Sequence, residues 1–303
     1  MNGGSITINN GLIMAVASSL SFSIMNVLIK ILGEYMHTGE IAFFRGLLGT
    51  VFLLFIMEKK HILFSHKETP MLLLRGALGG VSMLCFFISL THLSLGNAVI
   101  LAQLQSFFVI IFAAIFLKEM IPHGAAPALI TIVAGTAILL KVWEYNSFSV
   151  YALIAILGAV CSAAVYTTIR RLALSGLHSQ LEIVFFFMAP ATIVGAVYMG
   201  TDFVMPTAYM WLLILLLSIV SLMGQIFMTS AFSNTSPVLV SFVQYIGIVF
   251  NTFWGFTIFG EVLTWLSVIG GILIVGGSMY LTMLKSNRMK QIKLSMEKRW
   301  QQR

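Results

Sequence analysis

The chain has 303 residues, of which 59% are hydrophobic and 9% charged, and its mean hydropathy is +1.00. A soluble domain carries roughly 25% charged residues on its water-facing surface, so this composition excludes an ordinary soluble protein and predicts a chain whose solvent is lipid. The formal net charge of +7 does not indicate a nucleic-acid partner, because seven of the seventeen Lys and Arg residues lie in the last nineteen positions and no recognition motif accompanies them.

The first ten residues contain no Lys or Arg, so they lack the basic region of a secretory signal. We expect a short N-terminus at 1–10, followed by an uncleaved span. Apolar runs near bilayer length then recur along the chain, separated by polar breaks. They cover residues 11–31, 39–57, 71–91, 94–116, 121–141, 149–169, 180–200, 208–231, 235–258 and 262–284. The sequence predicts an all-α membrane protein with ten transmembrane helices.

Basic residues between the spans predict the orientation in the membrane. If the N-terminus is cytoplasmic, fourteen Lys and Arg residues lie on the cytoplasmic side and three, Lys30, Arg45 and Lys141, on the other. The basic tail at 285–303 supplies seven of the fourteen and would bind anionic lipid headgroups. We therefore expect a multi-pass protein of the cytoplasmic (inner) membrane with both termini in the cytoplasm and the lipid bilayer as a partner.

An internal repeat relates the two halves of the chain at an offset of 141 to 142 residues. At 142, Glu40 falls on Glu182 and Glu119 falls on Glu261. The two units cover residues 11–141 and 149–284. Each contains five spans, and because five is odd the second unit enters the membrane from the opposite side. The sequence predicts two inverted five-helix repeats, an arrangement found in many secondary transporters. The alternative, chance similarity between apolar helices, does not account for the matching charged residues.

Several segments resemble the drug/metabolite transporter superfamily, and in particular its EamA-type ten-helix group. The most specific are FLKEMI around Glu119 and FGEVLT around Glu261, each followed by a glycine-bearing helix. FFRGLLG around Arg45 and RGALGG at Arg75 are also similar to family segments. The chain departs from the family where a proline often interrupts the fourth and ninth helices, since Gln103-Leu104 and Tyr245-Ile246 stand there. The resemblance implies a central substrate cavity between helices one, three, four, six, eight and nine.

Polar residues near the middle of spans are the candidates for binding a small-molecule substrate, because burying them without partners costs several kcal/mol. In the ninth span, Gln244 and Asn251 share one helical face with Gly247. The full set of candidate substrate-binding residues is Asn26, Gln103, Tyr166, Gln225, Gln244, Tyr245 and Asn251. The competing interpretation is that these side chains only form hydrogen bonds between helices, and each such bond stabilises the bundle by about 0.6–2 kcal/mol.

Charged residues near span ends are candidates for structural or gating roles. Glu119 and Glu261 lie at helix ends, where a carboxylate can cap the following helix and interact favourably with its dipole. Lys30, Arg45 and Arg75 are expected near the membrane interfaces, where a long side chain reaches water easily. Of these, Arg45 is the most notable, because it lies a turn or two inside its span.

The preferred functional prediction is alternating-access transport of a small metabolite, such as an amino acid or a related compound. No Walker A loop and no zinc motif occur, so we expect no cofactor, no metal and no enzymatic activity. Broad-specificity drug efflux is an alternative, although no acidic residue falls in mid-span. A membrane-embedded lipid-modifying enzyme would depend on Glu58, His61, His66 and Glu68, which read more simply as a solvated loop. A channel is a third alternative, and the sequence is compatible with a homodimer.

Overall fold

The computed structural model describes residues 3–61, 64–65, 68–116, 124–141, 149–175, 179–234, 240 and 243–301. Within these ranges the regular elements are helices, and no strand occurs. The helices are α1 (Gly3–Leu32), α2 (Thr38–Lys59), α3 (Thr69–His92), α4 (Leu95–Ala102), α5 (Gln105–Phe116), α6 (Ala125–Leu140), α7 (Val150–Ser175), α8 (Gln180–Met199), α9 (Ala208–Asn234), α11 (Ile246–Phe259) and α12 (Trp265–Gln301). The all-helical class expected from the sequence is therefore found.

Six of the described helices are long and apolar enough to cross a membrane, namely α1, α2, α3, α8, α9 and α12. Four further apolar helices are shorter and cover Leu95–Val109, Ala125–Leu140, Val150–Val165 and Ile246–Phe259. Large apolar side chains such as Ile130, Val197 and Leu212 are mostly exposed on the outside of the bundle. A water-soluble monomer rarely exposes so much contiguous apolar surface. The chain is a membrane protein with several apolar helices.

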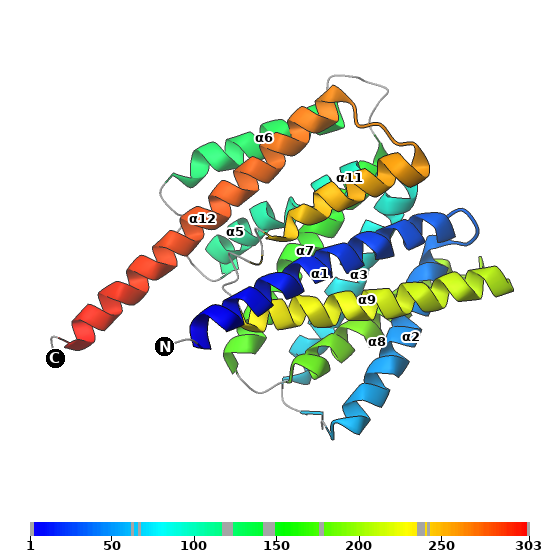
Figure 1. The fold of residues 1–303 in the computed structure, drawn as a ribbon, viewed down its shortest axis with the longest axis horizontal. Helices are drawn as coiled ribbons and strands as arrows, with labels where there is room; N and C mark the ends of the chain where they lie inside the picture. Colours follow the sequence, from blue (N-terminus) through cyan, green and yellow to red (C-terminus); the bar gives the residue numbers. More distant parts are fainter. Residues whose placement is uncertain are drawn as a thin grey trace.

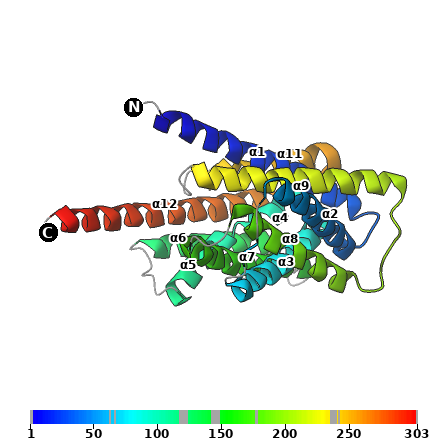
Figure 2. The ribbon, with the colours of Figure 1, turned by 90° about the horizontal axis from the view of Figure 1, so that it is seen from below.

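The two terminal helices are longer than their apolar spans. Helix α1 begins at Gly3, before the expected start at residue 11, and α12 runs on to Gln301 although its apolar part ends at Leu284. The C-terminal part of α12 projects beyond the other helices, and the two chain ends lie at the same end of the bundle (Figures 1 and 2). The basic segment after residue 284 is therefore a helical extension along most of its length.

Four helix pairs make the most extensive contacts in the bundle: α1 with α9, α2 with α8, α3 with α7, and α6 with α12. The α6–α12 pair lies at one edge, and the α2–α8 pair at the opposite edge (Figure 1). Small residues allow these close approaches. A Cβ atom on Gly135 of α6 would lie 2.8 Å from the carbonyl oxygen of Gly270 on α12. Each partner in these pairs comes from a different half of the chain.

The expected span at 94–116 is interrupted in its middle. Helix α4 ends at Ala102 and α5 begins at Gln105. The amides of Gln103 and Leu104 donate to carbonyls three residues back, at 3.1 and 3.0 Å, instead of four. Such tightened turns break the regular helix and often mark functional positions. A second interruption falls at Tyr245, just before α11. Both breaks lie at the positions where the sequence departs from the family's prolines, so the helices are interrupted there without proline.

Candidate functional site

A cavity of about 330 Å³ lies among the helices of the bundle. Its lining comes from α1, α2, α3, α4, α5, α7, α8, α9 and α11, and from the break residue Gln103. The volume is at the lower end of the roughly 300–1,000 Å³ that is typical of small-molecule sites. Because helices from both halves of the chain border it, a relative movement of the halves would change its shape and its access.

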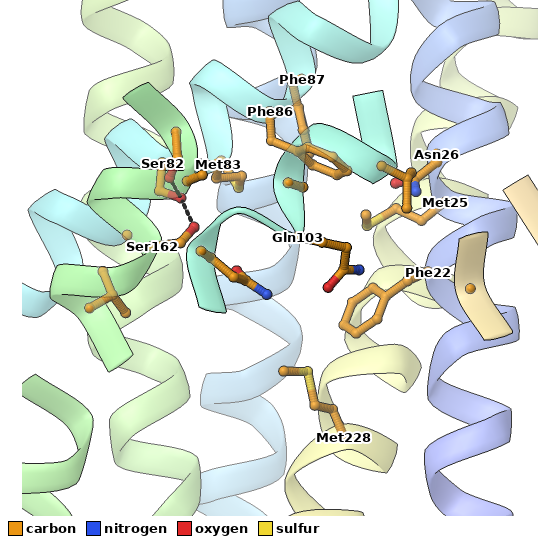
Figure 3. A pocket seen from close by; sticks show the side chains of 18 of the residues that line it. Phe22, Met25, Asn26, Ser82, Met83, Phe86, Phe87, Gln103, Ser162 and Met228 are labelled. Carbon is orange, nitrogen blue, oxygen red and sulfur yellow. Dashed lines mark hydrogen bonds between the residues drawn. The ribbon is translucent and has the colours of Figure 1, made fainter. Parts of the chain in front are cut away.

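Five of the seven residues expected to bind substrate line this cavity: Asn26, Gln103, Gln225, Gln244 and Asn251. The Gln103 side chain projects from the break between α4 and α5 into the middle of the labelled residues, near Phe22 (Figure 3). Tyr245 is buried but is not among the lining residues. The side chain of Tyr166 lies outside the described residues. The cavity therefore collects amide side chains from α1, α9, α11 and the helix breaks.

The wall formed by α1 and α11 is organised by an asparagine pair. The side-chain amide of Asn26 donates to Oδ1 of Asn251 at 3.0 Å, and Asn251 Nδ2 donates to the Gly247 carbonyl at 2.6 Å. Asn26 Oδ1 and Ser19 Oγ are buried and have no hydrogen-bond partner among the described residues. A buried polar atom without a partner costs about 1–3 kcal/mol. Both atoms belong to residues that line the cavity, and each lacks a hydrogen bond that a bound molecule or water reaching it would supply.

The opposite wall is formed by α3 and α7. Ser82 and Ser162 share a hydrogen bond there (Figure 3), and Ser82 Oγ also donates to the Gly158 carbonyl at 3.1 Å. The remaining surface of the cavity is largely aromatic or thioether in character. These residues are Phe22, Met25, Met83, Phe86, Phe87, Phe187 and Met228. An apolar wall with a few placed polar groups is the usual composition of a small-molecule site.

Two arginines also border the cavity, although the sequence placed them near the membrane interfaces. Arg45 is 2% exposed and Arg75 is 8% exposed, and both are lining residues. No Asp, Glu or Lys is among the described residues that line this cavity. The position of Arg45 inside an apolar run was a usable signal, because a charge within a span is rarely tolerated without a function. The sequence left the role of Arg45 open, and the structure places its side chain at the cavity.

Lys30 and Glu261 form an ion pair away from the cavity lining. Lys30 Nζ also donates to the Leu93 carbonyl at 2.7 Å, and Glu261 Oε2 accepts the backbone amide of Leu95 at 2.8 Å. The carboxylate therefore interacts with the first residue of α4, whereas the sequence predicted that it would cap the following helix. Thr264 takes that position for α12, since its hydroxyl accepts the amide of Ser267. Glu119 lies outside the described residues.

Comparison with known proteins gives consistent similarities over nearly the whole chain. The model of the EamA-like transporter family matches residues 9–141 and again residues 150–283. The pseudopaline exporter CntI of Pseudomonas aeruginosa is 41% identical over 269 residues, which is 88% of this chain and 94% of that protein. The riboflavin transporter of Brucella anthropi is 25% identical over 69% of this chain and 74% of its own length. A crystal structure with 16% sequence identity has a TM-score of 0.62 and covers 94% of this chain and 99% of its own, so it shares the fold.

Proposed function

Because the chain belongs to the EamA-like transporter family, we propose that it is a secondary transporter that moves a small organic metabolite across the cytoplasmic membrane by alternating access. The observation that carries this proposal is the cavity, which is bordered by helices from both family-matching stretches. A site between two similar units can open to one side of the membrane and then to the other when the units move against each other.

The contacts between the halves support an inverted repeat. At the sequence offset of 142, Glu40 of α2 corresponds to Glu182 of α8. Glu40 Oε2 accepts the amide of Val204, in the loop after α8, at 3.3 Å. Glu182 Oε1 accepts the amide of Ser65, in the loop after α2, at 2.8 Å. Each glutamate thus holds the loop that follows its partner helix, as expected for two units related by a two-fold axis.

The packing order supports the same relation. The five segments of the first half are α1, α2, α3, α4 with α5, and α6, and their counterparts in the second half are α7, α8, α9, α11 and α12. When each helix is replaced by its counterpart, the α1–α9 pair becomes the α7–α3 pair. The α2–α8 and α6–α12 pairs map onto themselves under the same exchange. The α5–α7 contact likewise maps onto the α1–α11 contact. This exchange symmetry is what a pseudo-two-fold axis lying in the membrane plane would produce.

The proposed topology has both termini in the cytoplasm. The chain ends lie at the same end of the bundle (Figure 1), and the basic residues favour the cytoplasmic side. Cysteines introduced at Lys60 and Lys290 should both be protected from an impermeant thiol reagent in intact cells and become labelled after permeabilisation. Labelling of only one position in intact cells would contradict the inverted repeat.

For the substrate, we propose a small amphipathic metabolite, with export of pseudopaline or a similar compound as the first candidate. This rests on the 41% identical relative and on a cavity that combines amides with aromatic surface. Purified protein in liposomes should give a saturable flux of pseudopaline, whereas protein-free liposomes should not. A parallel panel of radiolabelled amino acids and riboflavin would test the broader class. Absence of saturable flux for every compound would contradict the proposed function.

A further inference from the structure

The positive charge of Arg45 inside the cavity is the feature that indicates a ligand class. A guanidinium keeps its proton under all ordinary conditions. Arg45 lies on α2 and is 2% exposed, and its side chain borders the cavity rather than the outside of the bundle. Burying an ionised group costs several kcal/mol unless a counter-charge or solvent compensates it. The charge of this guanidinium therefore requires a compensating group.

The groups around Arg45 within the described residues are electrically neutral. Its Nε donates to Ser221 Oγ at 3.0 Å, and Nη1 contacts the sulfur of Met83. The rings of Phe87 and Phe187 lie 5.4 and 6.0 Å from the guanidinium carbon. The contacts with Ser221 and Met83 hold the side chain in one place, and the two rings supply cation–π attraction. Among the residues that the structure describes, no carboxylate pairs with Arg45.

A second guanidinium, that of Arg75, also borders the cavity. Arg75 of α3 lies over the ring of Phe187 at 5.6 Å, and its Nη1 donates to the Ile183 carbonyl at 2.6 Å. Because Arg45 and Arg75 both lie against Phe187, they face one part of the cavity. A low-dielectric site lined by one sign of charge concentrates ions of the opposite sign.

We propose that the cavity binds an organic anion, with a carboxylate or phosphate group of the substrate at Arg45. The planar guanidinium forms paired hydrogen bonds with either group. The rest of the molecule then extends toward the amide wall formed by Asn26, Gln244 and Asn251. This inference rests on the proposed function only in treating the cavity as the substrate site. It disfavours transport of cationic drugs, which the arginines would repel.

A cysteine reporter in the cavity tests this electrostatic preference without knowledge of the natural substrate. Cys85 and Cys161 are first replaced by alanine, and Ser162→Cys is introduced as the reporter. Ser162 is hydrogen-bonded to Ser82, whose neighbour Met83 contacts Arg45, so the thiol lies in the right region. The reporter is modified either by the anionic sulfonatoethyl or by the cationic trimethylammonioethyl methanethiosulfonate. The ratio of the two modification rates is compared with the same ratio for 2-mercaptoethanol.

The anionic reagent should be favoured about tenfold more strongly in the cavity than with the free thiol, because the positive charge of Arg45 attracts the anionic reagent and repels the cationic one. Arg45→Gln should remove most of this preference, and Arg45→Lys, which keeps the charge, should retain most of it. A ratio equal to that of the free thiol, or one unchanged by Arg45→Gln, would overturn the proposal.

Competition identifies the anionic group. Succinate or inorganic phosphate at the same concentration should slow modification of the reporter, and the stronger competitor indicates carboxylate or phosphate recognition. If neither slows the reaction, there is no bound anion and the inference is wrong. The flux assay distinguishes this failure from failure of the transport proposal. Charge selectivity without flux would leave an anion-binding protein that does not transport, and flux without charge selectivity would leave a transporter of uncharged compounds.

Discussion

Lys30 and Arg45 are two cations on consecutive helices of the first half, the first half-buried and the second buried, and their surroundings differ in one respect. Lys30 has a carboxylate partner in Glu261 and a carbonyl partner in Leu93, with the ring of Phe259 at 5.3 Å. Arg45 has a hydroxyl, a thioether and two aromatic rings. The charge of Lys30 is therefore neutralised inside the protein, and that of Arg45 is left for a molecule in the cavity. One cation stabilises the fold, and the other selects a ligand.

The largest expected effect comes from breaking the helix contact that holds the arginine region together. Gly76 follows Arg75, and a Cβ atom at Gly76 would collide with the backbone oxygen of Phe186, next to Phe187. Because backbone cannot move aside easily, Gly76→Ala should lower the free energy of unfolding by about 3 kcal/mol. The measurement is thermal unfolding in detergent. Gly276→Ala is the matched control, since nothing lies within 4 Å of its Cβ position, and it should be nearly neutral. Equal stabilities of the two variants would contradict the close α3–α8 contact.

The next largest effect should come from removing the carboxylate of the Lys30 pair. Glu261→Gln leaves the largely buried Lys30 ammonium with the Leu93 carbonyl and the Phe259 ring but without its carboxylate, and it weakens the interaction with the Leu95 amide. We expect a loss of about 2 kcal/mol, between the values for exposed and for fully buried pairs. The double variant Lys30→Met with Glu261→Gln should recover part of this loss, because the orphaned charge is gone. If the double variant is no more stable than Glu261→Gln, the pair is not coupled.

The apolar helices could be predicted from the sequence because their signal is local. A run of apolar residues near bilayer length identifies a span wherever it occurs, and α2, α3, α8 and α9 lie within a few residues of their predicted bounds. The interruption at Gln103 was not predicted, because residues 94–116 form one nearly continuous apolar run. It depends on packing of the chain around the cavity, which no local pattern encodes. The extent of α12 beyond Leu284 was also missed, because the apolar run that marks a span ends there and the segment that follows is polar and basic.

The site was harder to predict, because polar residues were assessed by depth in a span and not by the direction of the side chain. That criterion selected Asn26, Gln103 and Asn251, which line the cavity, and also Tyr245, which does not. It left the role of Arg45 open, because the length of an arginine allows it to reach water from several positions. Only the three-dimensional arrangement places Arg45 against Phe87 and Phe187, on other helices.

A smaller effect is expected at the amide wall, which carries hydrogen bonds but no charge. Asn251→Ala removes the acceptor for Asn26 Nδ2 and should raise the apparent KM for pseudopaline in liposomes by about fivefold, equivalent to about 1 kcal/mol. Gln244→Ala should act in the same direction, and both variants should still insert into the membrane. Ser278→Ala is the control, because this buried serine lies outside the cavity lining. Normal affinity and turnover in both amide variants would contradict the assignment of this wall.

The smallest effect on stability should come from Arg45, and this result would separate it most clearly from Lys30. Arg45→Gln loses the bond to Ser221 but also removes a charge that no described carboxylate neutralises. Because these contributions oppose each other, the free energy of unfolding should change by no more than about 1 kcal/mol. Substrate flux should nevertheless fall by about 30-fold or more, since a charge-assisted hydrogen bond contributes about 2 kcal/mol. Thermal unfolding and liposome flux measured on the same preparation decide the matter. Destabilisation as large as that of Glu261→Gln, with flux unchanged, would mean that the guanidinium only ties α2 to α9, and the distinction between the two cations would then be lost.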